Sequence, residues 1–309
     1  MMFLLLAALP SLFWDGAADT APVLRDAGIK QILVPAARLA SWKSVDGITA
    51  EAADPQSAVK VLAPTVNYRM NVAAATSSPW IVANGWRFIR RPGGRFYYDV
   101  TGRQAALAAA EAFSYAANAM IHSDAAGLKP LAAMLDFLRT IAGEPLPPVA
   151  DIGYIDDGSP ASGEVMNLLV RDNLLFQLVA APDRRLKVNV KLGTKEYPLE
   201  DARNPGTIAH AVRYNLTDEK RSVRIYGSQV VVARLTASEG RARLHLLNYA
   251  GASRKVDGIR VRVLGQYPKH QLWLADGAGV ELLDYSVEPG ATEFTLPELK
   301  TYAVIDLSR

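Results

Sequence analysis

The chain has 309 residues, of which 50% are hydrophobic and 21% are charged, which is the usual composition of a globular protein. The formal net charge is only +3 and the basic residues are spread along the chain, which argues against a nucleic-acid-binding surface. The chain contains no cysteine, and this excludes disulfides, thiolate metal sites and a cysteine nucleophile.

The first residues form an apolar segment, MMFLLLAALPSLFW, over residues 1–14. Its leucine-rich part is typical of a signal peptide, although no basic residue precedes it and no small-x-small cleavage site follows. We expect residues 1–12 to be an export-signal remnant. This predicts a periplasmic or secreted protein, with a cytoplasmic one as the alternative. The segment is too short to cross a membrane, and no later segment qualifies.

Short apolar runs alternate with helix-like segments over the next part of the chain. Strands are predicted at 12–15, 29–34, 48–52 and 59–66, and helices at 20–27 and 36–43. The aromatic stretch that follows contains Pro92-Gly93-Gly94, a turn signal that predicts a hairpin or an ordered excursion of the chain. Thr101 and Gln104 have the spacing of a capping box, which predicts the start of an alanine-rich helix over 104–119.

The same alternation continues to about residue 220. Strands are predicted at 119–124, 151–157 and 186–192. Helices are predicted from Leu128 to Gly143, over 207–216, and from about Val165 to Val179. Glu111, inside the alanine-rich helix, is expected on its solvated face.

Repeated strand–helix units are typical of a mainly parallel sheet. Seven or eight units over residues 13–220 predict a (β/α)-barrel-like domain. The alternative is a barrel fragment followed by a doubly wound subdomain that begins at Ile152. Residues 221–309 consist of short alternating runs separated by Gly or Pro turns, which predicts an antiparallel β-sandwich.

Several short segments carry a resemblance to known proteins. In the N-terminal part they are SLFWDG (11–16), AGI (27–29), VP (34–35), PWIVANGWRF (79–88) and AEAFSY (110–115). In the C-terminal part they are HLLNY (245–249) and TYAVIDL (301–307). With these segments the chain resembles uncharacterised bacterial glycoside-hydrolase-like barrel proteins that end in an all-β domain. Many barrel glycosidases carry an Asn-Glu pair at the end of a central strand, and this chain has none. Catalytic residues are therefore not carried over from that group.

Glycoside hydrolysis needs one carboxyl group as an acid and another as a base or nucleophile. Functional residues of a barrel lie at the carboxyl ends of its strands. This rule selects six acidic residues: Asp15, Glu51, Asp99, Asp124, Asp156 and Asp157. We expect the catalytic pair among Asp15, Glu51, Asp156 and Asp157. The alternative for Asp157 is a helix cap.

Sugars bind by stacking on aromatic rings and by hydrogen bonds from planar polar groups. Seven residues form the predicted binding set: Trp14, Asn67, Tyr68, Asn84, Trp86, Arg87 and Tyr98. The alternative is a hairpin whose aromatic residues alternate between the core and the surface.

Other kinds of site have little support in the sequence. The four histidines, at 122, 210, 245 and 270, do not have zinc-binding spacing, and no nucleophile elbow, dinucleotide fingerprint or P-loop occurs. No cofactor is firmly implied. Calcium could bind the strand-end aspartates, although the EF-hand spacing is missing.

Three functions follow from these patterns. We expect a glycoside hydrolase acting on an oligosaccharide or a small molecule by carboxylate chemistry. The alternatives are a carbohydrate-binding protein that has lost catalysis and a metal-assisted hydrolase of an ester or lactone.

Overall fold

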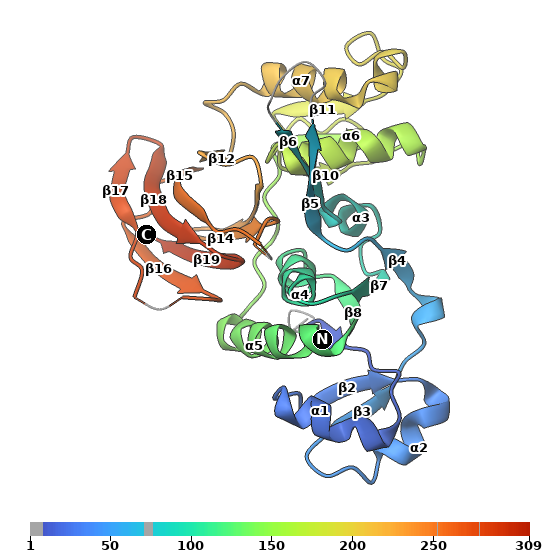
Figure 1. Ribbon diagram of the computed structural model, residues 1–309. Helices are drawn as coiled ribbons and strands as arrows, with labels where there is room; N and C mark the ends of the chain where they lie inside the picture. The colour runs from blue at the N-terminus through green and yellow to red at the C-terminus, as the bar shows by residue number, and fades with distance from the viewer. Residues whose placement is uncertain (1–8, 71–76, 252, 278) are drawn as a thin grey trace, which may run out of the picture. The chain divides into compact units, whose positions relative to one another are not determined.

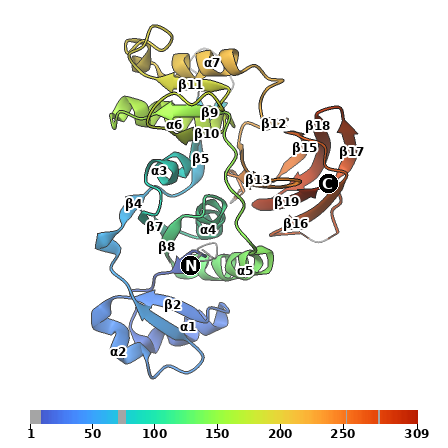
Figure 2. The same ribbon diagram turned by 180° about the vertical axis from the view of Figure 1, so that it is seen from behind.

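The computed structural model describes residues 9–70, 77–251, 253–277 and 279–309 (Figures 1 and 2). The predicted export segment falls mainly on residues 1–8, outside the described residues. The chain divides into two compact units, and we describe each by itself. The first unit comprises residues 1–65 and 91–145, and the second comprises residues 66–90 and 146–309.

Six parallel strands form the framework of the first unit. They are β1 (Ser11–Leu12), β2 (Gln31–Val34), β3 (Thr49–Ala52), β4 (Val59–Val61), β7 (Arg95–Val100) and β8 (Asn118–Ser123). One sheet has the order β1-β8-β7-β4, and β2 pairs with β3 in another. A parallel bridge between Phe13 and Leu33 connects the two sheets next to β1. The predicted strands before residue 66 are therefore present, with shorter bounds.

Two long helices, α4 (Gln104–Ser114) and α5 (Ala125–Ile141), pack against each other and against β8. Every residue of α4 from Ala105 to Ser114 is buried, because small alanine side chains allow close approach on all faces. The buried set includes Glu111, so the expectation of a solvated Glu111 is wrong. The helix begins at Gln104 without a side-chain cap from Arg103, so the predicted capping box does not form.

Shorter helices connect the first strands of this unit. They are α1 (Ala21–Asp26) and α2 (Leu39–Trp42), each preceded by a 3₁₀ turn, at Ala18–Thr20 and Ala36–Arg38. A third 3₁₀ turn, Pro55–Ser57, follows β3. Trp42 of α2 is fully buried and supplies part of the core below β2 and β3.

A smaller parallel sheet lies in the second unit. Its strands are β9 (Ile152–Ile155), β10 (Phe176–Leu178) and β11 (Val188–Lys191), in the order β10-β9-β11. Helices α6 (Pro160–Arg171) and α7 (Pro205–Leu216) follow β9 and β11, and the turn Asp201–Arg203 precedes α7. The predicted helix after Gly158 ends earlier than expected, because Asn173 has a positive φ of 56° and the chain then enters β10.

The hairpin predicted around Pro92-Gly93-Gly94 is wrong. Strand β6 (Ser77–Val82) pairs with β5 (Thr65–Met70), and the helix α3 (Gly85–Arg90) follows it. Strand β7 then runs parallel to β4 and β8. The Gly-rich turn therefore ends a helix and starts a parallel strand, which local turn chemistry alone does not distinguish from a hairpin.

The C-terminal part consists of two four-stranded antiparallel sheets. One has the order β12-β15-β18-β17 and the other β13-β14-β19-β16. The strands are β12 (Val223–Tyr226), β13 (Val231–Ser238), β14 (Arg241–Asn248), β15 (Val256–Leu264), β16 (Lys269–Leu274), β17 (Leu283–Glu288), β18 (Ala291–Leu299) and β19 (Tyr302–Ser308).

Alternate residues of these strands build one apolar core shared by both sheets. Leu244 and Ile305 come from one sheet, Val261 and Phe294 from the other, and all four are fully buried. The sequence alternation correctly predicted this antiparallel part, because a strand with one buried face places every second residue in the core.

A closed barrel is not confirmed by these sheets. The parallel strands belong to separate sheets, and among the residues that the structure describes none of the sheets closes on itself. The predicted boundary at residue 221 lies inside the second unit, just before β12. In the described part of the chain, no helix combines the length and the apolarity needed to cross a membrane.

The shared core gives a stability prediction. Replacing the fully buried Phe294 by Ala leaves a cavity between the two antiparallel sheets. We expect a loss of about 3–5 kcal/mol in the free energy of unfolding, measured by urea denaturation. Val287→Ala, on the exposed edge strand β17, is the matched control and should change stability little. Equal losses in both variants would contradict the assignment of the core.

Candidate functional site

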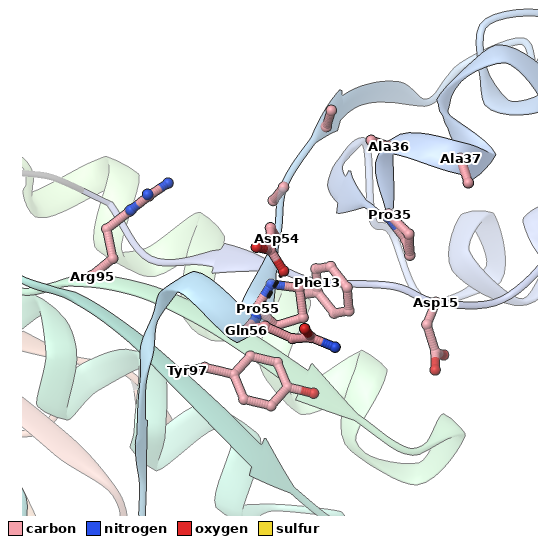
Figure 3. Close-up of a pocket in the computed structure, with 12 residues that line it drawn as sticks. Phe13, Asp15, Pro35, Ala36, Ala37, Asp54, Pro55, Gln56, Arg95 and Tyr97 are labelled. Atoms are coloured by element: carbon pink, nitrogen blue, oxygen red, sulfur yellow. Dashed lines mark hydrogen bonds between the residues drawn. The ribbon is translucent and has the colours of Figure 1, made fainter.

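A cleft of about 750 Å³ lies in the first unit at the carboxyl ends of parallel strands (Figure 3). Its lining residues are Phe13, Asp15, Pro35, Ala36, Ala37, Ala52, Ala53, Asp54, Pro55, Gln56, Arg95 and Tyr97. Most of them end or directly follow β1, β2 and β3. Parallel pairing explains this position, because it brings the same end of each strand to one edge.

Two aromatic rings form part of the cleft wall. Tyr97 meets Phe13 edge to face, with ring centroids 5.9 Å apart and planes at 84°. Residues alternate across β7, so Arg95, Tyr97 and Asp99 share one side while Phe96 and Tyr98 are buried on the other. Tyr98, one of the predicted substrate-binding residues, is therefore buried, whereas its neighbour Tyr97 lines the cleft.

A histidine joins two carboxylates beside the cleft. Nδ1 of His122 lies 3.0 Å from Oδ1 of Asp99, and Nε2 of the same ring lies 3.5 Å from Oδ1 of Asp15. Lys60 on β4 approaches the other Asp99 oxygen, with Nζ 3.6 Å from Oδ2. We call Asp15, His122 and Asp99 the histidine cluster. It lies on three adjacent strands, with Asp99 and His122 directly paired in the register of β7 and β8.

The electrostatics of the cluster are consistent with its geometry. The hydrogen bond from His122 is the largest factor that holds the pKa of Asp99 below its usual value, and Lys60 adds to the effect. Burial, together with the nearby negative charges of Asp99 and Asp15, raises the pKa of Tyr97 to about 12. Tyr97 is thus a neutral hydroxyl that can donate a hydrogen bond in the cleft.

A second carboxylate, Asp54, lines the same cleft just after β3. Its Oδ1 accepts a hydrogen bond of 2.9 Å from the backbone N–H of Gln56, which caps the 3₁₀ turn Pro55–Ser57. Figure 3 shows Asp54 and Asp15 on either side of the Phe13 ring. Glu51 was the acidic residue expected from this strand, but it is exposed within β3 and does not line the cleft. Asp54, just after β3, lines the cleft instead.

Trp14 lies next to this site but does not line the cleft. Its indole Nε1 donates a 2.9 Å hydrogen bond to Oγ1 of Thr20. The ring also lies where a Cβ on Gly16 would be, only 2.3 Å from Nε1. Gly16 therefore allows the chain after Asp15 to fold back under the indole ring, which explains the Asp-Gly sequence at this strand end.

Asp156 and Asp157 follow β9 in the second unit and make structural hydrogen bonds. Arg90 binds Asp156 with two hydrogen bonds of 2.7 and 2.8 Å. Asp157 accepts 2.9 Å from the backbone N–H of Ser159, and hydrogen bonding at Ser159 lowers the pKa of Asp157. The cap of α6 is Ser159, whose Oγ accepts a 3.1 Å hydrogen bond from the backbone N–H of Ser162, so Asp157 lies in the turn before the cap. Neither aspartate lines the described cleft.

The predicted sugar-binding residues after residue 66 also belong to the second unit. Asn84 is fully buried, and its Oδ1 accepts a 3.3 Å hydrogen bond from Arg87. Trp86 packs under the Arg87 guanidinium, 4.3 Å from the ring centroid. Asn67 and Tyr68 are exposed on β5. None of these residues is among those that line the described cleft.

A set of metal donors is absent from the part of the chain that the structure describes. Among the described residues, no group of three or more His, Asp or Glu side chains is arranged to hold a metal ion. Asp124 caps α5 by accepting hydrogen bonds from the backbone N–H groups of Gly102 and Gly127, at 2.8 and 3.0 Å. The calcium hypothesis remains a sequence-based expectation.

Sequence reasoning missed His122, Asp54 and Tyr97. His122 was considered only for zinc spacing, whereas its partners come from strands far away in the sequence. A usable signal did exist, because the strand over residues 118–123 ends in His122-Ser123, at the end where barrel sites lie.

Comparisons with known proteins give a fold and no family. No protein-family model matches the chain, and no curated protein matches it either. The α-L-fucosidase isoenzyme 2 from Paenibacillus thiaminolyticus matches with a TM-score of 0.56 at 9% identity, over 87% of this chain and 70% of that chain. A rhamnosidase from Novosphingobium sp. PP1Y has a TM-score of 0.47 at 10% identity, over 94% of this chain and 38% of that chain. The first likeness shows a glycoside-hydrolase-like fold; the second is too low to support an argument.

The ion pair between Arg90 and Asp156 predicts that removal of either side chain lowers the stability of the protein. Asp156→Ala leaves the guanidinium of Arg90 without two charged hydrogen bonds in a largely buried position. We expect a loss of about 1.5–3 kcal/mol in unfolding free energy. A double-mutant cycle with Arg90→Ala measures the coupling, and additive losses would show that the pair does not stabilise the protein.

The raised pKa of Tyr97 predicts that the free energy of unfolding falls at alkaline pH. The folded chain keeps the Tyr97 proton to about pH 12, whereas an ordinary tyrosine loses it near pH 10. Folding stability should therefore fall as pH rises from about 10 toward 12, because the unfolded chain binds fewer protons there. Tyr97→Phe should reduce this fall, measured by urea denaturation at several pH values. An unchanged slope would contradict the raised pKa.

Proposed function

We propose that this protein is a carbohydrate-acting hydrolase and that Asp15 and Asp54 are its catalytic carboxylates. The observation that carries the proposal is that both residues line one cleft, at the carboxyl ends of β1 and β3. Two carboxyl groups across a substrate cleft are what acid–base hydrolysis of a glycosidic bond requires. The glycoside-hydrolase-like fold supports the same conclusion.

The wall of the cleft suits a sugar ring. Phe13 and Tyr97 offer aromatic carbon to the apolar C–H face of a pyranose. The neutral Tyr97 hydroxyl and the Gln56 amide supply hydrogen-bonding groups for sugar hydroxyls. Arg95 lies at the end of the cleft away from Asp15 (Figure 3) and adds a cationic donor.

The proposal also covers the architecture of the first unit, the location of the protein and its first substrate to test. The order β3-β2-β1 keeps sequential strands adjacent, as in a (β/α)-barrel, and supports a barrel origin for this part of the first unit. The apolar N-terminal segment supports a periplasmic or secreted location. The fucosidase likeness makes an α-L-fucoside the first substrate to test.

The test is hydrolysis of a panel of 4-nitrophenyl glycosides, beginning with the α-L-fucoside, by the wild-type protein and three variants. Asp15→Asn and Asp54→Asn should each lower kcat by about 10²–10⁴-fold, because each removes one acid–base group. Asp46→Asn, an exposed aspartate of the same unit outside the cleft, should behave like the wild type.

Three outcomes would count against the proposal. Full activity in both cleft variants would show that other groups perform the chemistry. Oligosaccharide binding without turnover of any substrate would favour a non-catalytic carbohydrate-binding protein. Activity toward esters or lactones that a chelator removes would favour metal-assisted hydrolysis.

A further inference from the structure

Within the histidine cluster, Asp15 faces the imidazole ring of His122 in addition to sharing the cleft with Asp54. Nε2 of His122 faces Asp15 at 3.5 Å, while Nδ1 of the same ring faces Asp99 at 3.0 Å. An ionised carboxylate only accepts hydrogen bonds, so Nδ1 carries a proton and donates it to Asp99. In the neutral ring Nε2 then has a lone pair directed toward Asp15.

Asp99 is held in place on both of its oxygens. His122 contacts Oδ1, and Lys60 lies 3.6 Å from Oδ2. Direct register pairing of Asp99 and His122 on neighbouring strands fixes their Cα positions. The ring orientation, and so the direction of Nε2, is therefore set by a rigid part of the sheet, whereas Asp15 lies on the more exposed segment after β1.

We propose that His122, oriented by Asp99, is a positioning residue that passes a proton to and from Asp15. This inference rests on the proposed function, in which Asp15 is one of the two reacting carboxyl groups. The contact between His122 and Asp15 is too short to admit a sugar between them. His122 therefore acts through Asp15 and does not touch the substrate.

The proton balance over one turnover is complete. Asp15 donates its proton to the glycosidic oxygen as the carbon–oxygen bond breaks, and water bonds to the anomeric carbon while its proton passes to Asp54. His122, protonated on both nitrogens, then returns a proton from Nε2 to Asp15. Asp54 releases its proton to solvent and His122 takes one up, so no net proton is gained or lost.

The groups that face the ring determine how it titrates. Asp15 after β1 and Asp99 on β7 face its two nitrogens, and Lys60 on β4 reaches it through Asp99. Asp124 follows His122 on its own strand, but its Oδ1 is used to cap α5. Each aspartate places a carboxylate beside the ring, and Lys60 is the cation nearest to Asp99.

The first experiment needs no substrate. Spectra of ¹⁵N-histidine-labelled protein, recorded across pH, report the tautomer and protonation of each ring, and His122→Gln assigns the signal. We expect the Nδ1–H tautomer in neutral His122 and a titration curve that moves to lower pH in both Asp15→Asn and Asp99→Asn. His245 is the internal reference, because burial lowers its pKa to about 3 and it stays neutral. A His122 signal that is unchanged in both variants would overturn the proposal.

The second experiment measures turnover on any substrate that the panel identifies. His122→Gln should lower kcat at least about tenfold with little change in KM, because substrate binding is retained while proton delivery is lost. The alkaline limb of the pH profile should move to lower pH, since a lone carboxyl releases its proton more readily than an imidazolium. His210→Gln, on the exposed face of α7, is the matched control.

The two experiments separate two kinds of failure. If no glycoside is hydrolysed, the proposed function fails, and the spectra still decide whether His122 is coupled to both aspartates. If glycosides are hydrolysed and His122→Gln keeps the wild-type kcat and pH profile, the assignment of His122 is wrong while the hydrolase proposal stands.

Discussion

The register of three parallel strands is the constraint on which the candidate site depends. Hydrogen bonds pair Leu12 of β1 with Ile121 of β8, and Asp99 of β7 with His122 of β8. Because these strands run in the same direction, their carboxyl ends reach one edge together. Residues separated by more than 80 positions in the sequence thereby share one cluster. A shift of one residue in either pairing would turn His122 or Asp99 to the opposite face, because successive side chains of a strand alternate.

The opposite side of the same strands explains why the site can be held rigidly. Tyr98 and Phe96 are buried next to the site residues Tyr97 and Asp99. The Tyr98 hydroxyl donates a 2.6 Å hydrogen bond to Glu111 inside α4. A buried carboxylate is tolerated only with such partners. Each strand thus carries a buried face that fixes its position and an accessible face that carries polar chemistry.

Where the interpretation of the sequence was wrong, tertiary contacts determined a structure that differs from the one indicated by the local sequence pattern. The turn at Pro92-Gly93-Gly94 is real, but a helix comes before it, so no hairpin forms. Phe176 continues the apolar pattern of the preceding helix, yet it belongs to β10, because pairing with β9 buries it. Asp156 ends an apolar strand as predicted, and its carboxylate is bound by Arg90 from a helix 66 residues earlier. Spacing along the chain contains no information about such a partner.

The sequence by itself determined the alternation of strands and helices, the antiparallel C-terminal part and the position of Asp15 just after a strand. These features depend on periodicity and on side-chain type, which are local properties. Only the tertiary structure decided which acids share a cleft, because that depends on strand order and register. Asp15 was selected by both, whereas Asp54 and His122 became visible only when β1, β3, β7 and β8 were in place. The chemistry of a carboxylate depends on the groups that face it, and the fold determines which groups those are.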